Sequence, residues 1–260
     1  CITQKKRFGN SPHPVMLTVG NRNTDELNEV LFRGSNPVAV RRELKEVWEA
    51  MPPLTINRLL VPLALDPELR EAIRLVDGMS LAQIETDRDG EHLSTLRRKL
   101  GVAKVPASVK EIVARVEAGT KPILVGAWHT EVIDALASGL SDLGIKVRVL
   151  DGRTPATRKA AAVDAFNAGE IDVIVGQIAA MGVSLNLQGG SHIIVVEQDW
   201  SPALMSQFYA RCHRIGQRDH VHVDILESDT KLDKAVRKIA QRKASGHRAL
   251  TQQEEIDTHA

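Results

Sequence analysis

The residues best suited to chemistry are two arginines, Arg211 and Arg214, in the segment QFYARCHRIGQ at residues 207–217. Residues three apart lie about one turn apart on a helix, so both guanidinium groups would point the same way. Such a pair can neutralise the charge that spreads over a γ-phosphoryl group during its transfer. Spacing alone favours an ordinary pair of surface salt bridges, so the chemistry depends on what the rest of the chain supplies.

A helix is needed to position these arginines. Ser201 and Pro202 form an N-cap followed by proline at the first helical position. We therefore predict a helix over about residues 202–215, ended by Gly216. Cys212 lies inside this helix, where a small packing residue is expected.

A sheet is predicted around this helix. Five apolar runs alternate with helical patterns, at 122–126, 145–150, 171–175, 192–196 and 221–226. This alternation predicts an α/β fold in which a parallel sheet has right-handed crossovers and helices on both faces. Ligands of such sheets bind at the carboxyl ends of the strands. We therefore expect the chemistry in the loops that follow the first four strands, at 127–129, 151–154, 176–190 and 197–201.

The first hundred residues have a different pattern. We predict the domains as a mostly helical extension at 1–104, the α/β lobe at 105–245 and a polar tail at 246–260. Within the extension, residues 54–61 read as extended. Residues 77–104 read as a helical connector whose basic side chains, Arg97 and Lys104 among them, would line a solvated face. A separate helix is expected at 108–118.

Composition excludes several classes of protein. The net charge is +1 over 260 residues, so contact with nucleic acid has to come from a local basic face. No apolar run approaches a membrane span, and the first ten residues lack the apolar core of a signal peptide. The two cysteines, Cys1 and Cys212, give neither a disulfide framework nor a zinc spacing, so we predict a reducing compartment and no metal site. Because the first residue is Cys, we expect the chain to be part of a longer protein.

Four segments follow one another in the second half of the chain. They are DGRTPATR at 151–158, AAMGVSLNLQGG at 179–190, HIIVVEQDWSP at 192–202 and the arginine segment QFYARCHRIGQ. Their order and spacing resemble the second RecA-like lobe of Swi/Snf-type superfamily-two helicases, in which AAMGVSLNL resembles motif V and the arginine segment resembles motif VI. KPILVGAWHTEVIDAL at 121–136 resembles motif IV, closest to the annealing-helicase branch and its bacterial and phage relatives. The resemblance covers nearly the whole chain and implies a RecA-like lobe of an ATP-dependent DNA motor.

The resemblance also implies roles for the arginine segment. Arg214 would be the arginine finger, and Arg211 its partner on the γ-phosphate of ATP. Gln207, His213 and Gln217 would orient the two arginines or link them to motif V, because a buried guanidinium needs its donors satisfied.

Nucleotide and DNA contacts are implied as well. The candidates beside the nucleotide are Gly182, Asn186 and Gln217. The candidates for the DNA track, which would bind phosphates, are His129, Thr154, Arg158, Ser184 and Asn186. His129 fits equally well as a loop histidine satisfied within the protein. Asp199 and Trp200 would brace the start of the arginine helix, although Trp200 fits equally well as a core aromatic.

Two positions depart from the family pattern. Ser184 stands where the family usually has glycine, which changes the backbone freedom of the motif V turn. Gln177 stands just ahead of motif V, where Ser or Thr is common. One phosphate contact is therefore lost or is supplied by Gln177.

The sequence contains no Gly-x4-Gly-Lys-Ser/Thr pattern for a phosphate loop. Its one Asp-Glu pair, Asp25-Glu26, follows no apolar strand and so does not read as a Walker B carboxylate. ATP and Mg²⁺ would therefore be bound mainly by the N-terminal RecA-like lobe of the same protein, and this chain alone would not hydrolyse ATP. The other expected partner is double-stranded or branched DNA, in the cytoplasm of a bacterial or phage-infected cell or in a eukaryotic nucleus.

Two other functions stay open. A stand-alone, non-catalytic DNA- or protein-binding module would explain the basic closing helix at 229–248, although solubility explains that charge too. A nucleotide- or sugar-binding protein of another α/β class would need a glycine-rich loop after the first strand, where only Gly126 is found.

Overall fold

The computed structural model describes residues 2–6, 15–20, 23–33, 48, 51–87, 90–181 and 185–251. The chain divides into two compact units, of which the larger spans residues 50–241 and the smaller contains residues 1–49 and the end of the last helix from Arg242. In the smaller unit β1 (Ile2–Lys6) pairs antiparallel with β2 (Val15–Gly20), and α1 (Thr24–Asn28) leads into the π-helical turn η1 (Glu29–Arg33).

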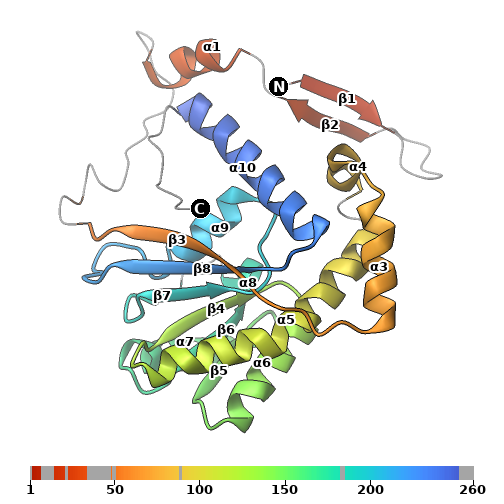
Figure 1. The fold of residues 1–260 in the computed structure, drawn as a ribbon. Coiled ribbons are helices and arrows are strands. Elements are labelled where there is room, and N and C mark those ends of the chain that lie inside the picture. Colours follow the sequence, from red (N-terminus) through yellow and green to blue (C-terminus); the bar gives the residue numbers. More distant parts are fainter. Residues whose placement is uncertain are drawn as a thin grey trace. The chain divides into compact units, whose positions relative to one another are not determined.

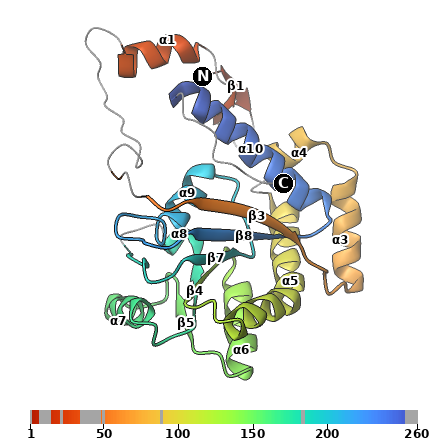
Figure 2. The same ribbon diagram turned by 60° about the vertical axis from the view of Figure 1, so that its left-hand side comes forward.

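Six parallel strands form the sheet of the larger unit, in the order β3-β8-β7-β4-β6-β5 (Figures 1 and 2). The strands are β3 (Leu54–Leu60), β4 (Ile123–Ala127), β5 (Val147–Leu150), β6 (Val173–Gln177), β7 (His192–Val195) and β8 (Val221–Glu227). The five predicted strands are β4 to β8, and the predicted parallel RecA-like sheet is confirmed. Its central strands are buried on both faces, which is why they read as continuous apolar runs.

The sixth strand, β3, joins the sheet at an edge beside β8. The pairing runs without interruption from Leu54 opposite Val221 to Leu60 opposite Glu227. The sequence predicts this segment as extended but assigns it to the helical extension, because no local feature of residues 54–60 indicates which strand they pair with. The partner lies more than 160 positions further along the chain, and only the tertiary fold supplies it.

Helices cover both faces of the sheet. One layer contains α6 (Thr130–Asp142) and the second half of α5 (Glu91–Glu117), and the other contains α7 (Ala156–Asn167), α8 (Ile178–Met181) and α9 (Pro202–Tyr209). Successive strand residues point to opposite faces, so Leu124 packs in the cluster under α7 to α9 whereas Val125 packs under α5 and α6. The prediction of helices on both faces is therefore confirmed.

A third apolar cluster supports the predicted helical extension. It is built by α3 (Pro67–Asp77), α4 (Leu81–Thr86), the first half of α5 and α10 (Lys231–Thr251), and it includes Trp200. Helix α5 is continuous over 27 residues and contains Pro106, so no break separates the predicted connector from the helix expected at 108–118. Residues 104 and 105, the predicted domain boundary, lie inside this helix.

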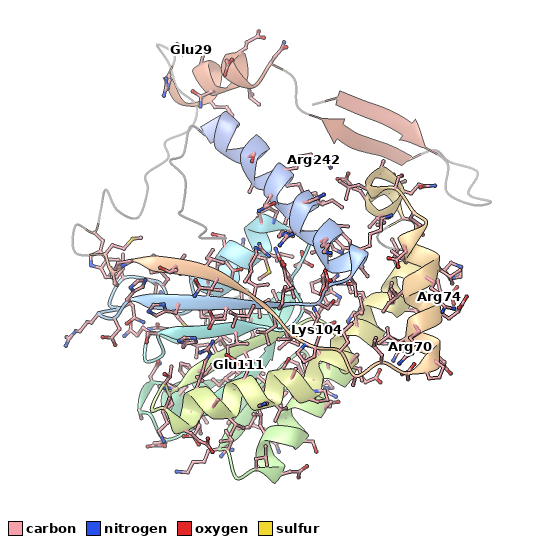
Figure 3. All side chains as sticks on the ribbon, viewed as in Figure 1. Glu29, Arg70, Arg74, Lys104, Glu111 and Arg242 are labelled. Carbon is pink, nitrogen blue, oxygen red and sulfur yellow. The ribbon has the colours of Figure 1, made fainter. Side chains whose placement is uncertain are left out.

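The middle of α5 corrects the prediction of a solvated basic face. Lys104 (Figure 3) is only 3% exposed, and its ammonium lies 2.7 Å from the Asp233 carboxylate of α10. It also donates to the carbonyl oxygens of Val196, at 3.3 Å, and Leu226, at 3.2 Å. The Arg97 side chain is only 13% exposed. The prediction placed both side chains in solvent because it treated this stretch as a surface connector. In the structure α5 runs from the third cluster onto the sheet, so the face that carries the two side chains packs against other elements.

Two glycines allow the helices that lead to the arginines to approach the sheet. Gly126 of β4 and Gly176 of β6 are paired neighbours. A Cβ at Gly126 would stand 2.6 Å from the Phe208 ring of α9, and one at Gly176 would stand 1.7 Å from the Met181 sulfur of α8. Only glycine leaves room for these contacts, so the two positions fix how closely α8 and α9 pack.

Candidate functional site

The loops at the carboxyl edge of the sheet are joined by Glu197, which follows β7. Its Oε2 accepts the backbone N–H groups of Trp128, at 2.8 Å, and His129, at 2.9 Å, and its Oε1 lies 2.6 Å from His129 Nδ1. Glu197 is only 4% exposed. Of the two interpretations of His129, the structure therefore supports a loop histidine that is satisfied within the protein, and a DNA contact of its ring remains a prediction.

Gln177, at the end of β6, occupies the position where the helicase family commonly has Ser or Thr. Its side-chain Nε2 donates to the Trp128 carbonyl oxygen at 3.2 Å. The amide therefore connects the end of β6 to the loop after β4. No phosphate contact is needed to explain this residue.

The loop after β5 is held by a network around Arg153. The guanidinium donates to both Asp134 oxygens, at 3.0 and 2.6 Å, and to Asp151 at 2.7 Å. Burial disfavours ionisation of Asp151, but hydrogen bonds and the charge of Arg153 outweigh it, so the pKa of Asp151 lies below its ordinary value. The Thr154 hydroxyl bonds within this loop, to Asp151 and to the Val149 carbonyl.

Helix α7 begins after that loop, and its N-cap is Pro155 without a side-chain cap bond. The Thr154 hydroxyl does not cap the helix, because its bonds lie inside the turn. Arg158, in the first turns of α7, has an exposed side chain. Of the predicted DNA contacts that the structure describes, Arg158 is thus the one whose charged group faces solvent.

The helix that leads to the arginines begins as predicted and ends early. The Ser201 hydroxyl accepts the Leu204 N–H at the N-cap, but α9 stops at Tyr209 rather than near residue 215. Beyond it the backbone bonds tighten to three-residue turns, as between Arg211 N and Phe208 O, and the Arg211 carbonyl accepts the Leu187 N–H at 2.9 Å. That long-range bond competes with helix continuation. Gly216, at a φ of 100°, ends the turn region.

The two arginines nevertheless meet. Arg211 Nη1 and Arg214 Nη1 both donate to the Leu185 carbonyl oxygen, at 3.5 and 3.4 Å, and Arg211 Nε donates to the Gln207 carbonyl at 2.9 Å. Burial lowers the pKa of Arg211, and the neighbouring charge of Arg214 lowers it further. The geometry therefore holds two cations against each other, an arrangement that an anion would relieve.

Gln217 fastens this arginine turn to the segment before β7. Its Nε2 donates to the carbonyl oxygens of Gln188, Gly190 and Cys212, at 3.1, 2.9 and 3.2 Å. Its Oε1 accepts the N–H groups of the next two residues. The side chain thus links motif V to motif VI, one of the two roles considered for it, and its polar atoms are bonded to backbone.

His213 has a different partner from the one predicted. Its Nε2 lies 2.8 Å from the Pro52 carbonyl oxygen, so it anchors the segment before β3 instead of the arginines or motif V. Gln207 is exposed on α9. Gly182 and Ser184 lie outside the described residues.

The sequence missed Asn167, which holds the motif V segment from α7. Its Nδ2 donates to the Asn186 carbonyl and its Oδ1 accepts the Gly189 N–H, both at 2.9 Å. Asn186 itself keeps a buried Oδ1 that has no hydrogen-bond partner among the described residues. The asparagine at the end of α7 gave no local signal, because its partners lie 19 and 22 positions away.

The loop between β7 and α9 is clamped by Arg97, which was also missed. Its guanidinium carbon lies over the rings of both Trp128 and Trp200, 5.2 and 5.7 Å from their centroids. It donates to the Gln198 carbonyl at 2.8 Å and lies 3.6 Å from the Asp199 carboxylate. Asp199 also accepts the Ser201 N–H at 2.7 Å, which supports its predicted bracing of the helix start. Trp200 is both a core residue and part of this clamp.

Arg58 of β3 holds the same loop from the other side. It donates to the Gln198 side chain at 3.0 Å and pairs with Glu227, which also accepts Arg237 of α10 at 3.0 Å. The extension and the last helix are therefore connected to the loop that starts the arginine helix.

An all-parallel sheet with helices on both faces and polar loops gathered at its carboxyl edge defines a RecA-like α/β lobe. The comparisons narrow this class. Residues 104–216 match the family model described as helicase conserved C-terminal domain. Residues 104–216 are thus similar to the C-terminal domain of helicases, and the relatives below include a SWI/SNF-related protein.

A Caenorhabditis elegans homologue of the SWI/SNF-related matrix-associated actin-dependent regulator of chromatin subfamily A-like protein 1 is 27% identical over 210 residues, which are 73% of this chain and 30% of that protein. The Neurospora crassa helicase swr-1 is 30% identical over 152 residues, which are 58% of this chain and 8% of that protein. This chain therefore spans less than a third of either relative. Because the matches include more than one branch, the predicted closeness to annealing helicases stays a prediction.

The fold also matches a solved structure, the C-terminal part of the Fun30 ATPase domain. The TM-score is 0.60 at 14% sequence identity, over 77% of this chain and 97% of that one. At this identity the likeness concerns the fold alone. Among the described residues, no helix is long and apolar enough to cross a membrane.

Proposed function

We propose that this chain is the second motor lobe of an ATP-dependent DNA translocase and that Arg211 and Arg214 act on the γ-phosphate of ATP held by the first lobe. The observation that supports this most directly is the meeting of both guanidinium groups at the Leu185 carbonyl oxygen. In this proposal Arg214 is the finger and Arg211 its partner, while Gln207 lies exposed on α9, the helix that leads to the two arginines.

The surrounding contacts suit this function because they hold the arginines before any phosphate arrives. Gln217 and the bond between Leu187 and Arg211 fix the turn to the motif V segment. A preorganised cation stabilises transition-state charge without reorganising at the moment of reaction. Burial, and then the charge of Arg214, lower the pKa of Arg211, and negative charge that develops beside both guanidinium groups relieves their repulsion.

ATP and Mg²⁺ fit this chain only in part. The sequence has no phosphate-loop pattern, so in our proposal the other lobe holds the nucleotide and the metal, and this chain contributes the arginines. The buried Oδ1 of Asn186, in the motif V segment, has no partner among the described residues and is an acceptor for a hydroxyl of a nucleotide or of DNA. We expect this chain alone to show no ATP hydrolysis.

DNA is the proposed substrate of the motor. Arg158 is the best phosphate contact among the described candidates, because its charge is exposed at the start of α7. Thr154 and His129 already bond within the protein and would have to exchange those bonds for phosphate. Phosphate contacts position the protein without selecting sequence.

The test uses the longer protein that contains this lobe, together with this chain alone. Arg214→Ala should lower DNA-stimulated ATP turnover by about a thousandfold or more while the Kd for ATP changes little. Lys110→Ala, which removes an exposed cation from α5, is the matched control. If Arg214→Ala retains normal turnover, the finger role is wrong. If the longer protein binds DNA without any ATPase activity, the binding-module alternative replaces the motor.

The relatives also bear on the cellular location of the protein. Those named above come from eukaryotes, and one carries the name of a chromatin regulator. We propose a nuclear location, and these relatives lend no support to a bacterial or phage source. Imaging of the fluorescently tagged longer protein tests this, and exclusion from the nucleus would contradict it.

A further inference from the structure

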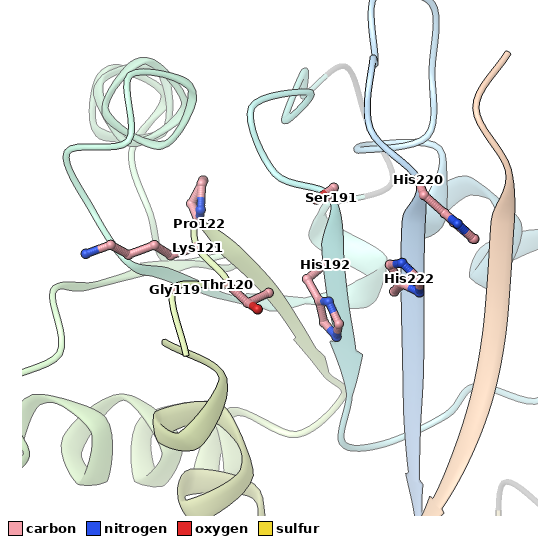
Figure 4. A pocket seen from close by; sticks show the side chains of 8 residues that line it. All are labelled: Gly119, Thr120, Lys121, Pro122, Ser191, His192, His220 and His222. Atoms are coloured by element: carbon pink, nitrogen blue, oxygen red, sulfur yellow. The ribbon is translucent and has the colours of Figure 1, made fainter. Parts of the chain in front are cut away.

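A second candidate site lies at the amino edge of the sheet, where β4, β7 and β8 begin, opposite the motif loops. Here a hollow of about 460 Å³ is lined by the segment 119–122 and by Ser191, His192, His220 and His222. Figure 4 shows the three imidazoles beside one another on the starts of β7 and β8, with residues 119–122 across from them. Lys121, Pro122 and His192 begin segments that resemble helicase motifs, but the resemblance assigns no role to any residue that lines this hollow.

The strand register builds this row of histidines. His192 of β7 stands directly opposite His222 of β8, and Thr55 of β3 stands on the other side of His222. The ring centroids of His192 and His222 are 5.7 Å apart, and those of His220 and His222 are 4.1 Å apart. The outer rings are anchored, His192 by Asp224 at 2.8 Å and His220 by Thr55 at 2.8 Å.

Several side chains that line the hollow have unused hydrogen-bonding capacity. Within the described part of the chain, the His222 ring and the hydroxyls of Thr120 and Ser191 make no hydrogen bond. Behind the row, Arg115 Nε is a buried donor that also lacks an acceptor there. A hollow that offers several unused hydrogen-bond donors and no unpaired carboxylate is suited to an anion.

The nearby carboxylates do not repel such a ligand, because both are already neutralised. Asp224 accepts from His192, from Asn57 at 3.0 Å and from Arg115 at 2.7 Å. Asp172 pairs with Lys121 at 3.1 Å and accepts the Lys146 N–H. The fixed charges around the row are Lys121, Lys146 and Arg115 against Asp172, Asp224 and Glu111, which cancel. Each imidazole that takes a proton therefore adds uncompensated positive charge to the hollow.

We infer that this hollow binds a phosphate group, either free as inorganic phosphate or pyrophosphate or as the terminal phosphate of a nucleic-acid end, with His222 as the central donor. A metal ion is a poorer fit, because stacked rings do not aim their nitrogens at one point and no metal-binding cluster occurs among the described residues. The inference is independent of the motor proposal, since the two sites lie at opposite edges of the sheet.

Binding should depend on pH in a defined direction. Burial lowers the pKa of His222, and the charges of His220 and His192 lower it further, so the free protein keeps this ring neutral near pH 7. A bound anion favours the charged ring. Because a phosphate group also gains a proton in this range, with a second pKa of about 6, the affinity calculated for each ionic form of the ligand should rise as the pH falls from 7.5 to 6.0, with proton uptake by the ring.

The test is calorimetric titration of the 260-residue chain with sodium pyrophosphate at constant ionic strength, at both pH values. We expect one site, tighter at pH 6.0, and about a tenfold loss of affinity in His222→Asn, from the loss of a hydrogen bond to a charged group. Lys238→Ala removes an exposed cation from α10 and should leave the affinity unchanged. Equal affinity in His222→Asn and the unmodified chain, or no binding at millimolar pyrophosphate, overturns the site.

A second measurement uses the unmodified chain, so its result does not depend on whether a variant folds. Pyrophosphate should shift the imidazole C2–H resonances of His192 and His222 in the unmodified chain, and unchanged resonances reject the site. Oligonucleotides with and without a 5′-phosphate distinguish the sources. A site that prefers the phosphorylated oligonucleotide serves nucleic-acid ends, and one that binds pyrophosphate alone serves a small phosphate.

Discussion

The buried ion pair between Lys104 and Asp233 gives the sharpest stability prediction. Lys104→Met keeps the length of the side chain and removes its charge, which leaves the Asp233 carboxylate in a site where its side chain is only 17% exposed. Removing one partner of a buried pair costs about 3–5 kcal/mol. The Ser228 N–H and hydroxyl still donate to Asp233, both at 2.7 Å, so we expect a value near the lower end, about 3 kcal/mol.

Lys99→Met is the matched control on the same helix. Lys99 pairs with Glu68 at 2.5 Å, but the Glu68 side chain is 81% exposed. Surface pairs of this kind contribute at most about 1 kcal/mol. The two substitutions thus remove the same charge from the same helix and differ only in burial.

The assay is thermal and urea unfolding of the whole chain. A loss of about 3 kcal/mol should lower the Tm by about 6–12 °C for a unit of this size, whereas the control should move it by about 4 °C or less. The double variant Lys104→Met, Asp233→Leu should recover most of the loss, because no uncompensated charge stays buried. If Lys104→Met costs no more than Lys99→Met, the reasoning from burial is refuted.

The sign of a pH effect provides a further check on this pair. Burial alone would raise the pKa of Asp233, but the charge and hydrogen bond of Lys104 and the bonds from Ser228 lower it below the ordinary value. A lowered carboxyl pKa stabilises the fold above the unfolded-state pKa, and this contribution is lost as the pH falls through the folded-state value. The acid limb of stability should therefore be shallower in Asp233→Leu.

Three further predictions concern the site. Arg97→Ala should lower the stability of the chain and change its tryptophan emission, and Arg97→Lys should restore neither. The reason is that a planar guanidinium stacks on the two indole rings, whereas an ammonium does not. Full rescue by lysine would contradict the stacking. Gly126→Ala should cost about 1–3 kcal/mol in urea unfolding through its clash with the α9 ring, whereas Gly152→Ala, with open space around it, should stay within about 0.5 kcal/mol, and equal costs would refute the packing account. Arg153→Ala should raise the pKa of Asp151 and so make the loss of stability in acid shallower, because less of the stability then depends on keeping this carboxylate ionised, measured by unfolding between pH 6 and 3, and an unchanged acid limb would contradict the network.

The alternation of strands and helices could be predicted because each element has its own local pattern of apolar and polar residues. Apolar runs such as 122–126 and 192–196 are buried on both faces, and their continuous hydrophobicity survives in the sequence alone. The arginine pair could be found for the same reason, since its spacing and its flanking N-cap are local features.

Contacts made across the chain could not be predicted. Helix α9 ends at Tyr209 because the Arg211 carbonyl bonds Leu187, a partner that helix propensity does not contain. The histidine row exists because the register of β7 and β8 places His192 opposite His222.

The sequence by itself thus determined the class of fold, the order of the motifs and the identity of the two arginines. Only the tertiary structure decided that β3 belongs to the sheet, that Lys104 is buried and Arg97 largely enclosed, and that the guanidinium groups of Arg211 and Arg214 meet at one carbonyl oxygen. The physical reason is that periodicity reports which face of an element is apolar, whereas burial of a charge depends on which distant carboxylate, ring or carbonyl compensates it.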